Sequence, residues 1–438
     1  MSDRATNTAA YVRTEMLAEQ APPSTQIGIV GWMRENLFSS VLNSVLTLLS
    51  IYVIYVVLSG VLPWVLGGIW RADSLSECRE IRNALYGEHR EVACWAVITQ
   101  RWPQLLFGFY PSGEYWRPVL ALVVFAVAVA PVLFDKLPRA LLGLTLASPF
   151  ICFWLLWGGS IWGPIVVALG FVIGWAIMTY GQGVLGALGS IIGAIVVPIL
   201  FWLLLAGPIA SVLGSAIPVG LEFVPSDKFG GFTLSFIIGM AGIILSLPLG
   251  IVLALGRQSD LFIINKSCVF FIEVIRGVPL IVWLFTASLL LNYFMPPGTN
   301  FDLLLRVIIM VTLFSSAYIA EVVRGGLAAL PRGQYEGADS LGLDYWQSMR
   351  LIVLPQALKI SIPGIVNSFI GLFKDTTLVV FIGLLDPIGL SNAIRATTDW
   401  QGIYWELFVF IGILFFICCF SMSRYSQYLE RKLRTDHR

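Results

Sequence analysis

The sequence predicts an all-α polytopic membrane protein that crosses the bilayer about ten times. Of its 438 residues, 58% are hydrophobic and only 12% are charged, whereas soluble domains carry about 25% charged residues. The mean hydropathy is +0.84, and the charges lie in clusters between apolar runs that are long enough to span a bilayer. The formal net charge is only +1, so nucleic-acid binding has no electrostatic support and we exclude it.

Residues 1–39 form a polar tail that contains many Ala, Ser and Thr residues. The tail lacks the basic start and the following apolar run of a signal peptide. From Trp32 onward an apolar stripe allows two interpretations. This segment either lies along the membrane surface or extends the first spanning helix, and the sequence favours neither.

Residues 40–225 are predicted to form auxiliary transmembrane helices. Residues 40–70 contain no charged residue and form the first apolar run, and residues 118–134 form the second. Residues 140–221 contain no charged residue at all, and their length fits three spans. Because no charge orients these three spans, re-entrant or interfacial segments remain an alternative. The expected spans are residues 140–158, 162–181 and 187–206.

A loop of mixed charge, residues 71–117, separates the first two spans, and we expect it on the periplasmic side. Cys78 and Cys94 both lie in this loop. In an oxidising compartment a disulfide between them is chemically allowed. Two unpaired thiols are the other interpretation. The other four cysteines lie in apolar segments, where we expect inert small side chains.

The C-terminal half, residues 226–425, contains five further apolar blocks. Basic residues gather at alternate ends of these blocks, and the positive-inside rule makes those ends cytoplasmic. This parity places both termini and the polar stretch 336–355 in the cytoplasm, with a polar tail at 426–438. About ten spans place both termini on the cytoplasmic side, and eight spans would also do so. The blocks cover residues 230–256, 264–294 (with a break), 303–325, 356–384 and 404–423.

The polar stretch 336–355 reads EGADSLGLDYWQSMRLIVLP and lies between two apolar blocks. We expect a short helix to begin near Tyr335, with Tyr335, Ala338 and Leu341 on one face. Gly342 should end it, because glycine tolerates the backbone angles of a helix stop. A second piece then leads to Pro355, where the next spanning helix is expected to start. Two short helices between membrane anchors form a protrusion on which another protein can dock.

The spacing in this stretch resembles the EAA loop of bacterial ABC-importer permeases. Glu336, Gly337 and Ala338 stand where that loop has Glu-Ala-Ala, so Gly337 replaces the first Ala. Gly342 follows, and Ile352-Val-Leu354-Pro355 closes the pattern. Sequences outside the loop, at 273–280, 321–327 and 374–377, are similar to the polar amino acid uptake family, and in particular to the general L-amino acid permease subunits. The resemblance covers roughly residues 226–425.

The resemblance implies a permease subunit of an ATP-driven importer that carries amino acids across the bacterial inner membrane. Its fold would be a type I core of five helices preceded by extra N-terminal helices. The implied partners are ABC ATPase subunits, a periplasmic amino-acid-binding protein and a second permease subunit, related or identical. Specificity in this family is set largely by the binding protein, so the resemblance does not say which amino acids are carried.

The resemblance also implies roles for the loop residues. Glu336 would make polar contacts at the ATPase surface, and Ala338 and Leu341 would fill a groove on it. Gly342 would provide the sharp turn between the two short helices. Gly337 in place of Ala should weaken the start of the first helix by up to about 1 kcal/mol.

The chain itself carries no pattern for nucleotide or metal chemistry. No Gly-x-x-x-x-Gly-Lys-Ser/Thr sequence occurs, and no cluster of His, Cys and carboxylate residues has metal-ligand spacing. We therefore expect neither enzymatic activity nor a cofactor in this chain. ATP and Mg²⁺ would be bound by the partner ATPase.

Charged residues inside the apolar blocks form a second group of candidates. The pairs Glu273 with Arg276 and Glu321 with Arg324 are each three residues apart, so each pair shares a helix face. One interpretation is contact with a zwitterionic substrate. The other, which we favour, is helix packing or permease pairing near the cytoplasmic boundary. Residues 374–375, Lys374 and Asp375, lie midway through a block, so we expect both to be buried, against substrate or against another helix.

An ion-coupled secondary transporter is the alternative function. It would account for the hydropathy and for the buried charges. It would not account for the spacing of residues 336–355, and the sequence shows no inverted internal repeat. A membrane enzyme is disfavoured because no catalytic cluster is present.

Overall fold

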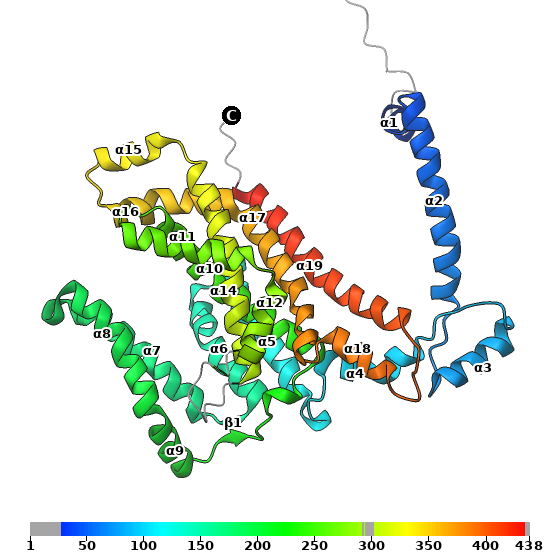
Figure 1. The fold of residues 1–438 in the computed structure, drawn as a ribbon, viewed down its shortest axis with the longest axis horizontal. Coiled ribbons are helices and arrows are strands. Elements are labelled where there is room, and N and C mark those ends of the chain that lie inside the picture. Colours follow the sequence, from blue (N-terminus) through cyan, green and yellow to red (C-terminus); the bar gives the residue numbers. More distant parts are fainter. Residues whose placement is uncertain (1–27, 291–292, 294–301, 434–438) are drawn as a thin grey trace, which may run out of the picture. The chain divides into compact units, whose positions relative to one another are not determined.

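The computed structural model describes residues 28–290, 293 and 302–433, and these residues are mostly helical (Figure 1). The chain divides into two compact units. The first comprises Met1–Ile69 and Arg82–Ala93, and the second comprises Trp70–Ile81 and Cys94–Arg438.

In the first unit, the segment around Trp32 is a separate helix. Helix α1 (Gly28–Asn36) ends before the long apolar helix α2 (Val41–Leu66) begins. The hydroxyl of Ser40 accepts a hydrogen bond from the amide of Asn43 and caps the start of α2. The segment is therefore not a continuous extension of the first span.

The expected periplasmic loop contains two helices, α3 (Leu75–Tyr86) and α4 (Ala96–Phe107). A disulfide joins Cys78 to Cys94, with Cα atoms 6.2 Å apart. The amide of Cys94 donates a hydrogen bond of 2.8 Å to Oε1 of Glu406, and the amide of Leu75 donates one of the same length to the carbonyl of Asp399. These two hydrogen bonds attach the disulfide-bonded segment to the residues around the start of the last helix.

Three of the auxiliary helices correspond to the spans expected between residues 140 and 206. Helix α8 begins five residues earlier than expected and contains a kink at Gly186, where φ is +68°. Strands β1 (Gly159–Ser160) and β2 (Gly220–Leu221) form a short antiparallel ladder. The helices of this region are η1 (Ser112–Glu114), α5 (Trp116–Leu133), η2 (Arg139–Leu141), α6 (Leu142–Trp157), α7 (Trp162–Tyr180), α8 (Gln182–Leu204), α9 (Ala206–Ala216) and η3 (Ser226–Lys228).

A fully buried arginine, Arg117, holds the auxiliary helices together at one end. Its guanidinium donates to the carbonyls of Leu155 at 2.7 Å and Glu222 at 2.9 Å. The hydroxyl of Tyr110 donates to the carbonyl of Leu156 at 2.8 Å, and burial raises its pKa to about 12. A buried cation is tolerated only when its N–H groups have partners. Arg117 therefore fixes the start of α5 against the end of α6 and the segment before α10.

The C-terminal core is organised around α10 and α14, which approach closely. A Cβ atom at Gly250 of α10 would lie 2.5 Å from Cγ2 of Ile319 in α14, so only glycine permits this contact. The core elements are α10 (Gly231–Arg257), α11 (Phe262–Gly277), α12 (Leu280–Phe285), η4 (Thr286–Leu290), α14 (Leu303–Ala328), α15 (Arg332–Ser340), α16 (Tyr345–Ser348), η5 (Met349–Val353), α17 (Leu354–Asp375), η6 (Thr376–Ile382), α18 (Pro387–Arg395) and α19 (Trp405–Leu433).

Within the described residues, nine helices are long and apolar enough to cross a membrane. Helices α11 and α12, bent by 101° between Gly277 and Leu280, bring the number to ten if they form one broken span. This confirms the predicted all-α polytopic class. Helix α19 runs to Leu433, so residues 426–433 of the expected polar tail are helical.

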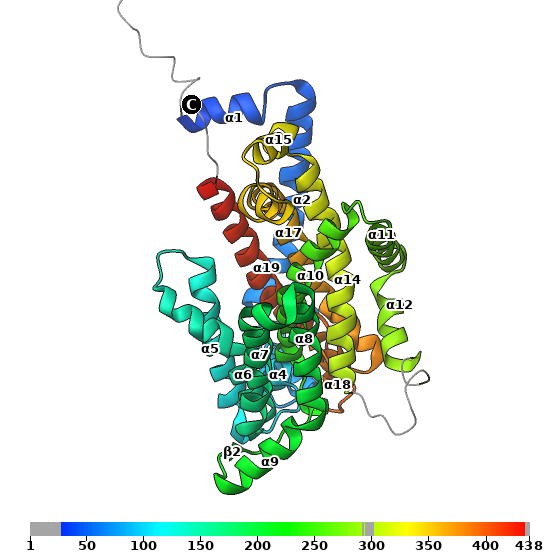
Figure 2. The same cartoon turned by 90° about the vertical axis from the view of Figure 1, so that its left-hand side faces the viewer.

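Contacts at the two ends of the second unit show which helix ends lie close together. Lys432 of α19 pairs with Asp135 after α5 at 2.6 Å, and the hydroxyl of Tyr425 donates to the carbonyl of Leu133. Helix α4 contacts the opposite end of α19. Figure 2 shows α15 at the same end as the C-terminal part of α19, and α4 and α18 at the other end.

Candidate functional site

The stretch 336–355 folds as two short helices joined by a sharp turn. Helix α15 begins at Arg332 after Pro331, three residues before the expected start at Tyr335. It ends at Ser340, and Gly342 adopts a φ of +70°, a left-handed conformation that favours glycine. Asp344 and Gln347 form a capping box at α16. Helix α16 then continues through η5 into α17, whose first turn contains Pro355.

The predicted docking residues differ in exposure. Glu336 and Gly337 are exposed, and Leu341 is 74% exposed. Ala338 is only 1% exposed, so it packs within its own chain and does not present a surface to a partner. This corrects its expected role, because a small residue on the inner face of α15 supports the loop.

The remaining residues of the pattern anchor the loop to the next span. Ile352 and Leu354 are half-buried and flank the fully buried Val353. Sequence reasoning missed Tyr345 and Trp346, which are 50% and 70% exposed beside the turn. Two aromatic residues directly after a helix cap in a polar stretch were the available signal.

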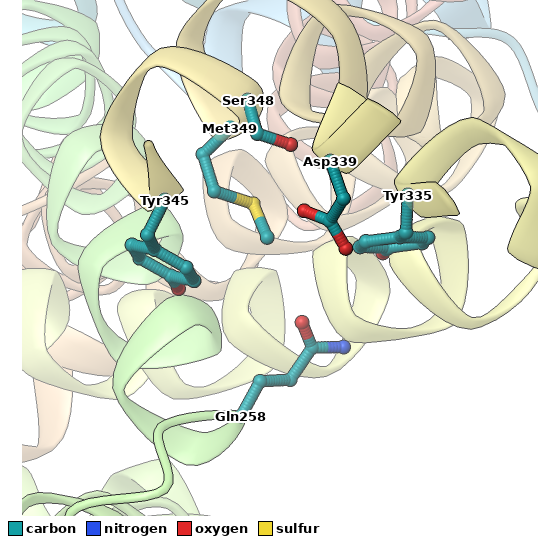
Figure 3. A pocket seen from close by; sticks show the side chains of 6 residues that line it. All are labelled: Gln258, Tyr335, Asp339, Tyr345, Ser348 and Met349. Carbon is teal, nitrogen blue, oxygen red and sulfur yellow. The ribbon is translucent and has the colours of Figure 1, made fainter. Parts of the chain in front are cut away.

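A polar pocket of about 550 Å³ lies beside the loop (Figure 3). Burial raises the pKa of the Tyr335 hydroxyl, with a smaller contribution from Tyr345, so Tyr335 stays a neutral hydrogen-bond donor. The pocket was not predicted, because Gln258 comes from a distant part of the chain. Its lining residues are Gln258, Tyr335, Asp339, Tyr345, Ser348 and Met349.

The charged residues of α11 and α14 form one cluster around Glu321. Glu321 accepts from Arg324 at 3.2 Å, as its spacing predicts, and from Arg257 at 2.5 Å, and it lies 3.7 Å from Arg276. Glu273 pairs with Arg257 at 3.0 Å rather than with Arg276 as expected. Arg257 ends α10, so the cluster joins three helices at one end of the core. This geometry supports the packing interpretation.

A cavity of about 310 Å³ lies between α14 and α17. Asp375 is half-buried in its wall, but Lys374 is exposed, contrary to the expectation that both are buried. Successive residues of a helix point about 100° apart, so the two side chains cannot both face the cavity. The guanidinium carbon of Arg276 lies 5.4 Å from the ring centre of Tyr318, which links the cavity to the Glu321 cluster. The lining residues are Phe314, Ser315, Tyr318, Asn367, Ser368, Gly371, Leu372 and Asp375.

Up to ten candidate spans, a two-helix protrusion at one end of the core and a cavity between core helices with Asp375 in its wall are typical of a membrane transport permease. Residues 246–435 match the family described as binding-protein-dependent transport system inner membrane component. The proteins that are similar to the chain include three permease proteins. The glutamate/glutamine/aspartate/asparagine transport system permease protein BztC of Rhodobacter capsulatus is 58% identical over 430 residues, which cover 98% of this chain and 99% of that protein.

The inner membrane amino-acid ABC transporter permease protein YhdY of Escherichia coli is 39% identical, with 92% of this chain and 93% of that protein covered. The probable glutamine ABC transporter permease protein GlnP of Bacillus subtilis is 31% identical, with 46% of this chain and 90% of that protein covered. More than half of this chain thus lies outside the alignment with the shorter relative, whereas both longer relatives align with nearly all of it.

The chain belongs to the amino-acid ABC transporter permeases. It is the membrane-spanning subunit of an ABC importer of amino acids, and nothing in these similarities supports the ion-coupled alternative. Permeases of this family are not themselves catalytic, so an ATPase subunit is the implied partner. The family description and the spans identify a multi-pass inner membrane component.

Proposed function

We propose that this permease carries acidic amino acids and their amides. The observation that supports the proposal is the 58% identity to the glutamate/glutamine/aspartate/asparagine permease over nearly the whole length of both chains. Identity of this extent includes the auxiliary helices as well as the core, so it favours a shared transport system rather than a shared core alone.

We infer that residues 336–355 couple this subunit to the ATPase. Leu341 and Trp346 offer exposed apolar surface, and Glu336 offers a charge beside it. The helical path from Tyr345 to Ile382 is continuous over 38 residues. At 1.5 Å per residue it reaches about 57 Å, so a push on α16 moves the wall of the cavity that contains Asp375.

We infer that the cavity between α14 and α17 is part of the transport path. Its volume of about 310 Å³ accommodates one amino acid. The Asp375 carboxylate would pair with the substrate ammonium group, and Ser315, Asn367 and Ser368 would supply hydrogen bonds. The Glu321 cluster would hold α10, α11 and α14 together at the end where substrate leaves, and Lys374 would face another helix.

The proposed orientation places α15 and both termini in the cytoplasm and residues 71–117 in the periplasm. A disulfide between Cys78 and Cys94 suits an oxidising compartment. A periplasmic amino-acid-binding protein would deliver substrate at the end that carries α4 and α18. A second permease subunit, related or identical, would complete the pathway, and the ATPase pair would bind ATP and Mg²⁺ below it.

Uptake by proteoliposomes tests this function. The permease is reconstituted with its co-purifying subunits and binding protein, and labelled glutamate uptake is measured with and without enclosed ATP. We expect ATP-dependent uptake that glutamine, aspartate and asparagine compete for and that lysine and leucine do not. Uptake that follows an ion gradient without ATP would overturn the importer assignment. Competition by lysine would overturn only the substrate class.

A further inference from the structure

The polar pocket beside α15 brings together three segments of the chain. Gln258 follows α10, Tyr335 and Asp339 lie on α15, and Tyr345 begins α16 (Figure 3). Tyr335 and Asp339 are four residues apart, so they share one face of the helix. In Figure 3 the Asp339 carboxylate, the Gln258 amide and the two tyrosine rings surround one space of about 550 Å³.

The chemistry of this lining favours a cation. The lining contains one carboxylate, Asp339, and no basic side chain. Within the part of the chain that the structure describes, no ion pair to Asp339 is formed. The faces of the Tyr335 and Tyr345 rings attract a guanidinium or ammonium group, and the Gln258 oxygen can accept a hydrogen bond from it. A carboxylate between two aromatic rings is thus complementary to a long basic side chain.

The position of the pocket identifies where such a side chain comes from. Tyr345 lines the pocket and is also half-exposed at its rim, next to the exposed Trp346. Leu341, at the end of α15, is the other exposed apolar residue of the loop. A protein that covers these apolar side chains also covers the mouth of the pocket.

We propose that the pocket receives one basic side chain, an arginine or a lysine, from the ATPase subunit. The proposal rests on the proposed role of residues 336–355 in coupling. Its consequence is mechanical, because the occupant touches Gln258 at the end of α10 as well as α15 and α16. One inserted side chain thus connects the ATPase to two parts of the permease that are about eighty residues apart in sequence.

The first test is retention of the ATPase by the permease in the purified complex. Asp339→Asn keeps the size of the side chain and removes its charge. We expect the ATPase retained at about 0.15 M salt to fall at least tenfold, because the variant leaves the inserted basic side chain without a counter-charge in an interface that excludes water. Asp227→Asn makes the same change at an exposed carboxylate of η3, outside residues 336–355 and outside the pocket lining, so it is the matched control and should retain the ATPase. Unchanged retention in Asp339→Asn would overturn the proposal.

The second test detects contact with the ATPase directly rather than the strength of binding. The photo-crosslinker p-benzoylphenylalanine replaces Tyr335 inside the pocket or Leu341 on the exposed surface, and the intact complex is irradiated. We expect the probe at 335 to attach to an ATPase peptide next to a lysine or arginine. Attachment from 341 but not from 335 would overturn the insertion of a basic side chain into the pocket, but not the docking of the ATPase on residues 336–355. Attachment from neither position would overturn the docking site itself.

Discussion

At the scale of single residues, Glu321 holds the ends of three core helices together. It is one carboxylate, 19% exposed, in contact with guanidinium groups from α10, α11 and α14. Glu273 is 56% exposed, and among the described residues its ion-pair partner is Arg257 alone. A poorly solvated carboxylate between several cations contributes far more than an exposed one, because water screens the exposed pair.

We therefore expect Glu321→Gln to destabilise the protein by about 3 kcal/mol, because three arginines would lose their shared counter-charge. Glu273→Gln should cost no more than about 1 kcal/mol. The melting temperature of the two variants in detergent, measured beside the unmodified protein, checks the difference. Equal shifts for the two variants would contradict the central role of Glu321.

Sequence reasoning at this scale predicted one ion pair of the Glu321 cluster and missed another. Spacing of three predicts neighbours on one helix, and the Glu321–Arg324 pair formed as predicted. Spacing carries no information about other helices, so the bond from Arg257 to Glu273 could not be foreseen. Lys374 and Asp375 were treated together because they are adjacent, although adjacent residues of a helix face different directions.

At the scale of elements, the apolar runs predicted the spans because a bilayer fixes their length. The ends of helices that depend on polar contacts were predicted less accurately. Helix α15 starts earlier than expected because Pro331 precedes it, and proline favours a helix start. Helix α19 continues to Leu433, where Lys432 pairs with Asp135 in a turn almost 300 residues earlier. Contacts of that kind leave no local pattern in the sequence.

Two glycines of the stretch 336–355 provide a matched pair of substitutions. A Cβ atom at either Gly337 or Gly342 would meet nothing within 4 Å, but only Gly342 has a positive φ. Gly337→Ala should stabilise α15 by up to about 1 kcal/mol, because alanine is the better helix former. Gly342→Ala should cost about 1–2 kcal/mol, because the left-handed conformation crowds a Cβ atom.

Hydrogen exchange of the α15 amides in the purified complex should therefore slow in Gly337→Ala and accelerate in Gly342→Ala. If the turn transmits force, ATP-driven uptake falls in Gly342→Ala and persists in Gly337→Ala. A Gly342→Ala variant with faster exchange and full uptake would show that the turn is not needed for coupling.

At the scale of the whole molecule, contacts between distant segments show which ends of α4, α5 and α19 lie together. No charge orients residues 140–221, so the sequence left re-entrant segments open. In the structure, Asp135 meets the end of α19, whereas Cys94 meets Glu406 near its beginning. The turn after α5 and the disulfide-bonded segment therefore lie at opposite ends of the same last helix.

This arrangement predicts which surface positions face which compartment. Ser112 and Ser340 are both exposed, one near the α4 end of the unit and one on α15. Each is replaced by cysteine in a protein whose four unpaired cysteines, in or beside the apolar helices, have been changed to alanine. A membrane-impermeant maleimide should then label Ser112→Cys in spheroplasts, and Ser340→Cys only after the membrane is permeabilised.

The native pair provides an internal check on the same experiment. Cys78 and Cys94 are joined by a disulfide and are only 2% and 4% exposed, so they should resist the maleimide and leave the introduced cysteine as the labelled site. Labelling of Ser340→Cys before permeabilisation would place α15 outside the cell. An ATPase in the cytoplasm could not reach it there, so that single result would remove both the coupling role of the loop and the basic-side-chain pocket beside it.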